Sequence, residues 1–427
     1  MAKQLPGGVF RSDLKLSDER DIYYYDSKEI SRTAVDKRDD KAQPGIGHLR
    51  FDPLVNEWVA VASHRQHRVF LPPKELCPLC VSNGDKLTEI PDSNYEVVVF
   101  TNRSPALTTP GANYKLPAVI GFDTPNADAA GACEVVCYTQ DHGSTFAQLS
   151  LEQIRTVLEA WKDRDAQLSK LSYIEYVFPF ENRGEEVGVT LSHPHGQIYA
   201  YSFIPPRVEK MLQAAASHLS KTGRVLLDDV IAREIKDKKR IICENSEWIA
   251  FVPYAARYPF EIHIAPKRGV ASISELDENQ SQLFPALAKE VLTRLDGVFG
   301  IEMAYIASWY QAPVNTGRDS MRLHWQIVSV RRQPGKLKYL SGSESAMGAF
   351  IMDLEPEQSI EITSTPPIEV KTFTKSVGSL PGTAIVMSSM PRPFSLRNTT
   401  KPRISPPANP IADATAPRDP GRSGSET

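Results

Sequence analysis

Apolar and polar residues alternate in short runs through the first half of the chain, a pattern typical of strands. Residues 96–100 and 134–138 are rich in β-branched side chains and predict two strands. A helix is expected after Ser150, because Gln153 three residues later completes a capping box. Its apolar residues then recur at helical spacing, at Leu151, Ile154, Leu158 and Trp161. Two further strands are predicted at 173–180 and 195–203.

The second half of the chain repeats this order of elements. Strands are predicted at 248–252, 260–264, 303–309 and 322–330. The helix between them opens at Asp277, again with a glutamine, Gln280, three residues on. The string His195-Gly196-Gln197-Ile198 recurs as His324-Trp325-Gln326-Ile327 about 130 residues later. We therefore expect an α+β fold of two tandem halves, each an antiparallel-rich sheet with helices on one face, and one sheet could run through both.

The two ends of the chain differ from this body. Residues 1–45 are polar and weakly patterned, and they predict a loosely ordered leader. Residues 376–427 are rich in proline and poor in large apolar side chains, so they cannot bury enough surface to offset their ordering entropy. The predicted organisation is thus a leader over 1–45, halves over 46–205 and 206–372, and a disordered tail over 373–427.

Charge and composition exclude several classes of protein. A net charge of −3 and a pI of about 6.3 provide no basic field for nucleic acid. No apolar stretch is long enough to span a membrane, and the N-terminus lacks the apolar core of a signal peptide. Five cysteines are too few and too scattered for a disulfide framework. These features predict a cytoplasmic protein with reduced thiols.

Two of the cysteines have the spacing of metal ligands. The gap between Cys77 and Cys80 allows both thiolates to reach one tetrahedral zinc ion. His142 and His193 are candidates for the remaining ligands, although they lie far along the chain. A pair of buried cysteines in a proline turn is the alternative. Cys133 and Cys137 fall within a valine-rich strand pattern and are interpreted as core thiols.

The string His193-Pro194-His195-Gly196-Gln197 carries the strongest sign of chemistry. A nucleophilic imidazole needs one nitrogen free and the other held as a donor. Gly196 permits close approach of the backbone to a phosphate, and the amide of Gln197 can stabilise charge on a phosphoryl oxygen. Attack on an α-phosphate would give a nucleotidyl-histidine. The alternative is a pair of histidines that bind metal only.

Candidate phosphate contacts flank these motifs. Arg65 and Arg68 are spaced to clamp a diphosphate, although a solvated charged turn explains an isolated arginine pair equally well. A polar, glycine-containing loop precedes the histidines, with Asn182, Gly188 and Thr190 as candidates for contacts to phosphate or ribose.

Taken together, these motifs resemble the galactose-1-phosphate uridylyltransferase family, a branch of the histidine-triad superfamily. The resemblance covers about residues 48–350 in sequence order. It includes Asp52-Pro53-Leu54-Val55-Asn56-Glu57-Trp58, His64-Arg65-Gln66-His67-Arg68, Cys77-Pro78-Leu79-Cys80, Phe100-Thr101-Asn102, Asp141-His142, Phe180-Glu181-Asn182-Arg183-Gly184, the histidine string, Trp309, Ala312-Pro313 and Lys336-Leu337-Lys338-Tyr339-Leu340.

The resemblance implies a ping-pong transfer between UDP-glucose and galactose 1-phosphate. His195 would form a uridylyl intermediate, the backbone carbonyl of His193 would hold its tautomer, and Gln197 would bind the phosphoryl group. Nucleotide or phosphate contacts are implied for Arg65, Arg68, Asn102, Asn182, Gly188 and Thr190. Sugar-phosphate contacts across a homodimer interface are implied for Lys338, Tyr339 and Glu344. A structural zinc site is implied for Cys77, Cys80, His142 and His193.

The chain departs from the family pattern in the second half. Many members hold a second metal with one glutamate and three histidines. Here Tyr310 replaces one histidine and Arg322 another, so at most Glu209 and His324 remain. Two ligands beside a cationic arginine should not hold a divalent ion, so we expect this site to be empty. A Glu209–Arg322 ion pair could replace the metal if the two segments meet.

Two other readings of the sequence stay open. An adenylyl-transferring relative, acting on ADP-glucose or dinucleoside polyphosphates, would use the same nucleophile. A non-catalytic nucleotide-binding protein would also account for the altered second half. Hexose specificity is a further open point, because the segment after Glu344 lacks the amide that some family members present to the sugar.

Overall fold

The computed structural model describes residues 2–39, 45, 47–67, 70–111 and 126–364. These residues belong to one compact unit, which spans Met1–Glu369. The predicted tail over 373–427 and the side chain of Arg68 lie outside the described residues, so neither expectation is tested.

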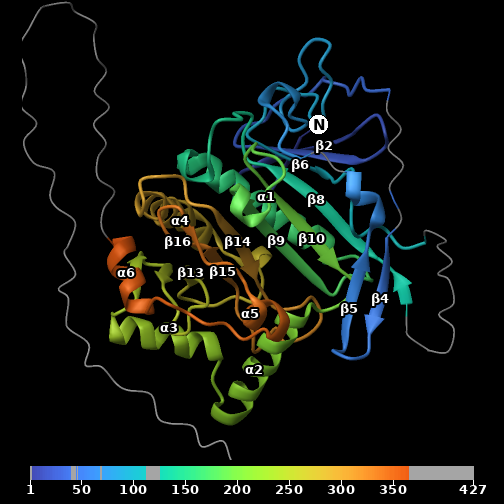
Figure 1. The fold of residues 1–427 in the computed structure, drawn as a ribbon. Coiled ribbons are helices and arrows are strands. Elements are labelled where there is room, and N and C mark those ends of the chain that lie inside the picture. Colours follow the sequence, from blue (N-terminus) through green and yellow to red (C-terminus); the bar gives the residue numbers. More distant parts are fainter. Residues whose placement is uncertain (1, 40–44, 46, 68–69, 112–125, 365–427) are drawn as a thin grey trace, which may run out of the picture. The chain divides into compact units, whose positions relative to one another are not determined.

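A twelve-stranded sheet forms the centre of the fold (Figure 1). Its order is β1-β2-β3-β6-β8-β10-β9-β14-β15-β13-β12-β11, and every neighbouring pair is antiparallel. The strands of the first half are β6 (Val97–Thr101), β8 (Gly131–Cys137), β9 (Tyr176–Arg183) and β10 (His195–Tyr201). Those of the second are β11 (Ile241–Glu244), β12 (Trp248–Phe251), β13 (Phe260–Pro266), β14 (Tyr305–Tyr310) and β15 (His324–Ser329).

The strand order confirms the tandem repeat. The series β6-β8-β10-β9 is followed by β14-β15-β13-β12, which is the same arrangement in reverse. Strand β9 pairs with β14 at the centre, with Asn182 opposite Ile306. One continuous sheet therefore runs through both halves, and β10 and β15 occupy equivalent places on either side of the central pair.

Helices cover both faces of this sheet. On one face α1 (Leu151–Leu168) and α4 (Glu278–Gly297) pack against a shared core that contains Trp161, Trp248, Trp309 and Trp325. On the other face, α2 (Pro206–Thr222) contributes to an apolar cluster with residues of both halves, and α3 (Leu226–Asp237) contributes to a cluster with β12 and β13. Among the described residues, 3-10 helices lie in the connections at Ser63–His67, Lys74–Leu76, Phe146–Gln148, Glu185–Val187 and Ile273–Glu275.

The two long helices begin where their caps predict. Ser150 accepts a hydrogen bond from the backbone of Gln153, and Asp277 forms the complete capping box with Gln280. The side chain of Gln153 instead donates to the backbone oxygen of Tyr138 at 2.7 Å, which ties α1 to the end of β8. Leu151 is half-exposed and does not belong to the buried face of α1. Of the capping box predicted at Ser150, the hydrogen bond to the Ser150 side chain forms, but the one from the Gln153 side chain back to residue 150 does not.

The prediction of a loosely ordered leader over 1–45 is wrong for its described residues. Strands β1 (Lys3–Gln4), β2 (Phe10–Lys15) and β3 (Asp21–Asp26) extend the sheet, and β3 pairs directly with β6. The physical reason is burial, because Ile22, Tyr24 and Tyr25 of β3 are withdrawn from solvent on both of its faces. The leader is thus part of the core of the first half.

The remaining elements flank the sheet. A three-stranded sheet consists of β4 (His48–Asp52), β5 (Glu57–Val61) and β7 (Asn126–Asp128). A hairpin of β16 (Arg331–Gln333) and β17 (Lys336–Leu337) leads to the short helices α5 (Gly342–Met347) and α6 (Pro356–Ser364). Within the described residues, no helix combines the length and apolar character needed to cross a membrane.

Candidate active site and metal cluster

Strand β10 presents its side chains to two different environments. Ile198 and Ala200 belong to the core beneath α1 and α4. His195 and Gln197 alternate with them and therefore face the other side of the sheet. Asn182 of β9 lies on this same side, since antiparallel partners share a face and Phe180 is paired with Gln197. The three predicted residues are thus brought together by strand pairing.

Position 196, between His195 and Gln197, is a glycine for a steric reason. A Cβ atom at this position would lie 1.9 Å from the hydroxyl of Tyr138 and 2.8 Å from the backbone oxygen of Phe180. Tyr138 is fully buried and belongs to the core under α1. The glycine therefore lets the core approach the strand closely, in addition to any contact with a ligand.

Replacing Gly196 by alanine should destabilise the protein by about 2 kcal/mol, because the strand or Tyr138 has to move. Chemical denaturation would measure this change, with Gly143→Ala as the control, since a Cβ at Gly143 meets no atom closer than 3.6 Å. Adding Tyr138→Phe removes the clashing hydroxyl and should restore part of the loss. Equal stability of the Gly196→Ala variant and the wild type would contradict the steric explanation.

The imidazole of His195 is held in one orientation. Its Nδ1 lies 2.7 Å from the backbone oxygen of His193 and donates a hydrogen bond to it. Since a neutral imidazole carries one proton, Nε2 is left with a free lone pair. Burial lowers the pKa of His195 from its ordinary value, so the neutral form dominates at neutral pH. The ring has the tautomer that a nucleophile requires.

Cys77, Cys80, His142 and His193 converge on one point. Each offers one ligand atom, and these four atoms all lie within 4.8 Å of one another. The Cys80 sulfur lies 3.3 Å from Nδ1 of His142 and 3.6 Å from Nδ1 of His193. Such separations match the edges of a tetrahedron around an ion with bonds of about 2.0–2.3 Å. The structure therefore brings together the four predicted ligands in a cluster that fits a metal ion.

Neighbouring groups orient the two histidines of this cluster. Nε2 of His193 donates to the backbone oxygen of Thr139 at 2.9 Å, and Nε2 of His142 lies 3.1 Å from the hydroxyl of Ser192. These contacts at Nε2 leave both rings with Nδ1 directed at the cysteines, the orientation that a metal ligand needs. Burial lowers the pKa of His193 to about 4, so this ring is a neutral ligand.

The surroundings of Cys80 favour its protonated thiol. Burial, together with the nearby Cys77, raises the pKa of Cys80 to about 11. A bound divalent ion would supply the charge that favours both thiolates. His193 joins this cluster to His195, because its ring faces the cysteines while its backbone oxygen holds the His195 imidazole.

A cavity of about 330 Å³ lies beside His195. Of the residues singled out in the sequence, Asn182, His193 and His195 line it. Gly188 and Thr190 belong to the loop that bounds it, where Gly188 has a left-handed φ of 79° and Thr190 accepts a hydrogen bond from the backbone of Leu71. Arg331 and Glu186 form an ion pair at its wall that sequence reasoning missed.

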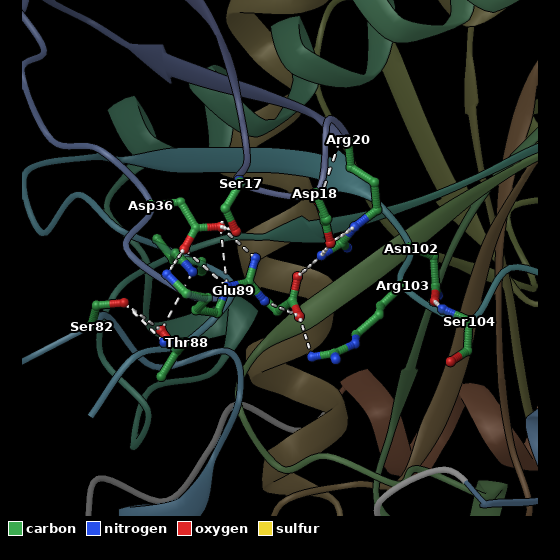
Figure 2. Close-up of polar contacts among 12 residues, drawn as sticks. Ser17, Asp18, Arg20, Asp36, Ser82, Thr88, Glu89, Asn102, Arg103 and Ser104 are labelled. Carbon is green, nitrogen blue, oxygen red and sulfur yellow. Dashed lines mark hydrogen bonds and ion pairs between the residues drawn. The ribbon is translucent and has the colours of Figure 1, made fainter. Parts of the chain in front are cut away.

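Arg65 lies on the side of the sheet that carries His195, whereas Asn102 lines a different cavity. The guanidinium of Arg65 lies 3.3 Å from the hydroxyl of Tyr199, which shares the outer face of β10 with His195 and Gln197. Asn102 accepts a hydrogen bond from the backbone of Ser104 (Figure 2). It lines a separate cavity of about 750 Å³. The structure thus places Arg65 on the strand face of His195 but does not bring Asn102 into its cavity.

A charged network fastens the N-terminal strands to the cysteine loop (Figure 2). The carboxylate of Glu89 is bound by Arg20 at 2.5 Å and Arg38 at 2.6 Å, and Arg103 lies 3.6 Å away. The adjacent Thr88 donates its hydroxyl proton to the backbone oxygen of Cys80. The leader therefore supports the metal cluster, a role that polarity alone did not reveal.

Lys338, Tyr339 and Glu344 lie elsewhere in the chain. Lys338 and Glu344 form a buried ion pair of 3.0 Å. Tyr339 is 76% exposed. None of the three lines the cavity at His195 in the described structure.

The suggested Glu209–Arg322 ion pair is wrong. Nε of Arg322 lies 3.8 Å from Asp228 of α3, and its Nη1 donates to three nearby backbone oxygens. Glu209 is exposed because Val208 and Ala215 occupy the buried face of α2. His324 instead stacks on Tyr310, with ring centroids 5.6 Å apart. That this half holds no metal stays a prediction.

Comparisons with known proteins extend over most of the chain. Two models of the galactose-1-phosphate uridyl transferase family match it, the N-terminal domain over residues 36–205 and the C-terminal domain over residues 211–337. A galactose-1-phosphate uridylyltransferase from Streptomyces lividans is 40% identical over 324 residues, or 74% of this chain and 86% of that protein.

Solved structures agree with this match. A uridylyltransferase structure superposes with a TM-score of 0.65 and 31% identity, and the match covers 74% of this chain and 97% of that one. An ADP-glucose phosphorylase from Arabidopsis thaliana, solved with bound ADP-glucose, gives a TM-score of 0.58 and 25% identity over 74% and 98% of the two chains. The resemblance inferred from the motifs is confirmed, and the chain belongs to the galactose-1-phosphate uridyl transferase family.

Proposed function

We propose that this protein exchanges the uridylyl group between UDP-glucose and galactose 1-phosphate through a covalent intermediate on His195. In the first step Nε2 attacks the α-phosphorus of UDP-glucose. The new P–N bond replaces the P–O bond to the leaving phosphate, and glucose 1-phosphate departs. The products of this step are uridylyl-His195 and glucose 1-phosphate.

The second step reverses the first with another sugar phosphate. A phosphate oxygen of galactose 1-phosphate attacks the uridylyl phosphorus, the P–N bond breaks, and UDP-galactose leaves. The amide of Gln197 is the donor for the phosphoryl oxygen, because it lies on the same strand face as His195. Arg65, Arg68, Asn102, Asn182, Gly188 and Thr190 are assigned to the nucleotide and its phosphates.

The orientation of His195 is the observation that supports this proposal most directly. Attack through Nε2 requires a ring with Nδ1 protonated and Nε2 free, and the 2.7 Å hydrogen bond to His193 selects that tautomer. When phosphorus bonds to Nε2, the ring becomes cationic. The same backbone oxygen then stabilises the proton on Nδ1, so one contact supports both the attack and the intermediate.

The metal of the Cys77–Cys80–His142–His193 cluster is assigned as zinc with a structural role. Two thiolates and two imidazoles in tetrahedral arrangement are a typical zinc ligand set. With all four positions held by protein, a zinc ion would stabilise the loop that supplies the His193 carbonyl. Reduced thiols are needed for this, and five unpaired cysteines support a cytoplasmic location.

Intact-protein mass spectrometry after incubation with UDP-glucose tests the proposal. A uridylyl adduct that galactose 1-phosphate discharges is the expected result, and ADP-glucose in parallel should give none. An adduct from ADP-glucose alone would move the protein to the adenylyl-transferring relatives. The absence of both adducts in folded, metal-loaded protein would contradict transfer chemistry and favour a non-catalytic nucleotide-binding protein.

A homodimer is proposed to complete the hexose site. Lys338, Tyr339 and Glu344 do not line the cavity of their own chain, so they would have to act on a second copy. The segment around them is exposed and apolar, with Leu340, Met347 and Ile351 on the surface beside Tyr339. A surface of this kind fits a protein partner better than water.

Met347→Asp should therefore shift the protein toward monomer and lower kcat/KM by about 100-fold, through loss of sugar-phosphate contacts. Size-exclusion chromatography with light scattering and a coupled transfer assay would measure both effects. Val35→Asp, at an exposed valine far along the chain, is the control and should change neither. A monomer with full activity would disprove the shared site.

A further inference from the structure

The second half of the sheet carries a cavity that the proposed reaction does not use. Its volume is about 840 Å³, larger than the cavity at His195. Helices α2 and α3 form its outer wall, and β12, β13 and β15 form its floor. Organic ligands of nucleotide size occupy cavities of about 300–1,000 Å³. The space is therefore sufficient for such a molecule.

This cavity occupies the place that mirrors the catalytic half. In the reversed strand order β15 corresponds to β10, so His324 and Gln326 correspond to His195 and Gln197. Nδ1 of His324 lies 3.2 Å from the backbone oxygen of Arg322, as Nδ1 of His195 lies 2.7 Å from that of His193. The geometry of the histidine is thus retained in the second half.

The second histidine cannot act as a nucleophile in this state. Its Nε2 accepts a hydrogen bond from the Gln326 amide at 2.9 Å. The oxygen of that amide accepts from Arg207 at 2.7 Å, which fixes the amide orientation. The lone pair that attacks phosphorus in the catalytic half is therefore already occupied here, and this site is suited to binding rather than to chemistry.

Two arginines near the floor of the cavity each have a buried Nε without a hydrogen-bond partner in the described structure. Nε of Arg322, which lines the cavity, is buried and has no hydrogen-bond partner in the described structure, and its nearest carboxylate, Asp228, is 3.8 Å away. Arg207 supports Gln326 from beside the cavity and makes no ion pair with any described residue. Burial of such charges is costly unless an anion compensates them.

The carboxylates that line the cavity have cationic partners: Arg240 contacts Glu234 and Glu357, and Arg233 lies 3.7 Å from Asp237. Glu261 accepts hydrogen bonds from Arg257 at 2.7 Å and lies 3.1 Å from Nε2 of His263. Burial, then His263 and the two arginines Arg207 and Arg257, lower the pKa of His324 to about 3. The lining holds five Lys or Arg side chains and four carboxylates, so its charge balance favours an anion over a divalent metal.

The walls above this floor are apolar. Met211, Leu227, Val230 and Phe251 face the cavity, and the ring of Phe251 meets that of His263 edge-on at 5.7 Å. A ligand that fits both the apolar walls and the arginines at the floor combines a ring with an anionic group. We propose that this cavity binds a phosphorylated ring compound, a nucleotide or sugar phosphate, as a second and non-catalytic ligand site.

Counting binding sites by isothermal titration calorimetry tests this proposal. The probes are UMP and glucose 1-phosphate, with uridine and glucose as their uncharged counterparts, each to millimolar concentration. The two phosphates distinguish the two sources of the ligand. At least one of them should bind at the second cavity, and its uncharged counterpart should bind there about tenfold more weakly or worse. No binding there by any probe, or equal affinity for the uncharged counterpart, would overturn the proposal.

Two variants assign the second site to this cavity. Arg322→Met removes the cation whose Nε lacks a hydrogen-bond partner in the described structure, and Ala214→Trp fills the cavity from an exposed position on α2. Each should weaken the second binding event about tenfold or more and leave uridylyl-His195 formation intact. Ala216→Trp, also exposed on α2 but outside the cavity, is the matched control.

If the second binding event were unchanged in both Arg322→Met and Ala214→Trp, the ligand would not bind in this cavity. The adduct measurement in the same preparations keeps the two proposals separate. If the wild type binds a ligand at the second cavity but forms no uridylyl adduct, only the proposed transferase function is contradicted. If it forms the adduct but binds no ligand at the second cavity, only this inference is contradicted.

Discussion

Replacing His195 by alanine will lower kcat for uridylyl transfer by about 10⁴-fold or more. The variant loses the nitrogen that bonds to phosphorus. Transfer would then require galactose 1-phosphate to attack UDP-glucose directly. Stability should change little, because the ring projects from the outer face of β10 rather than into the core under α1. A coupled assay with UDP-glucose and galactose 1-phosphate measures the rate.

The matched control for this variant is His218→Ala on α2. His218 is bound to Asp229 at 2.7 Å and does not line the cavity at His195. It should retain wild-type kcat. If the His195→Ala variant kept even a tenth of the wild-type rate, the nucleophile would have to be another group.

Replacing Cys80 by alanine will release the metal and destabilise the first half. The Cys80 sulfur lies 3.3 Å and 3.6 Å from Nδ1 of the two histidines, and its loss leaves three ligands and an open position. We expect metal content to fall from about one ion per chain to well below that, and the free energy of unfolding to fall by about 3 kcal/mol or more. Elemental analysis and thermal denaturation measure the two effects.

Loss of activity should accompany loss of the metal in this variant. The reason is that His193 would no longer be fixed, and its backbone oxygen holds the His195 ring. Cys243→Ala is the control, since this cysteine lies outside the cluster and should keep its metal and rate. A fully metal-loaded and stable Cys80→Ala protein would show that the cluster is not the metal site.

The repeat could be predicted because it rests on local patterns. The caps at Ser150 and Asp277, and the related strings around His195 and His324, reflect backbone geometry within a few residues. The continuous sheet was less accessible, because the pairing of β9 with β14 depends on contacts across more than a hundred residues. Periodicity predicts strands but not their neighbours.

The leader shows where local reading failed. Its charged residues suggested a solvated segment, yet those charges are used in partly buried pairs such as Arg32–Asp26 and Arg20–Glu89. The informative signal was the run Ile22-Tyr23-Tyr24-Tyr25, which forms a strand with buried residues on both faces. Charge alone does not distinguish a paired residue from a solvated one.

Some residues of the candidate site could be found from local motifs, and others depend on contacts far along the chain. The spacing of Cys77 and Cys80 and the order of the histidine string are local, so both could be read directly. His142 was a candidate ligand from the sequence, but its convergence with the cysteines depends on contacts across about 60 residues, and the family resemblance gave the main support for it. Arg322 was misassigned because its partner Asp228 belongs to α3, a helix that the sequence patterns had not been used to place.

The most direct test of the central claim is isotope exchange between labelled glucose 1-phosphate and UDP-glucose with no galactose 1-phosphate present. A covalent uridylyl-His195 intermediate predicts that label enters UDP-glucose at a rate comparable to net transfer, and that His195→Ala shows none. A protein that transfers uridylyl groups only when both sugar phosphates are bound would show no exchange, and this result would contradict the two-step mechanism.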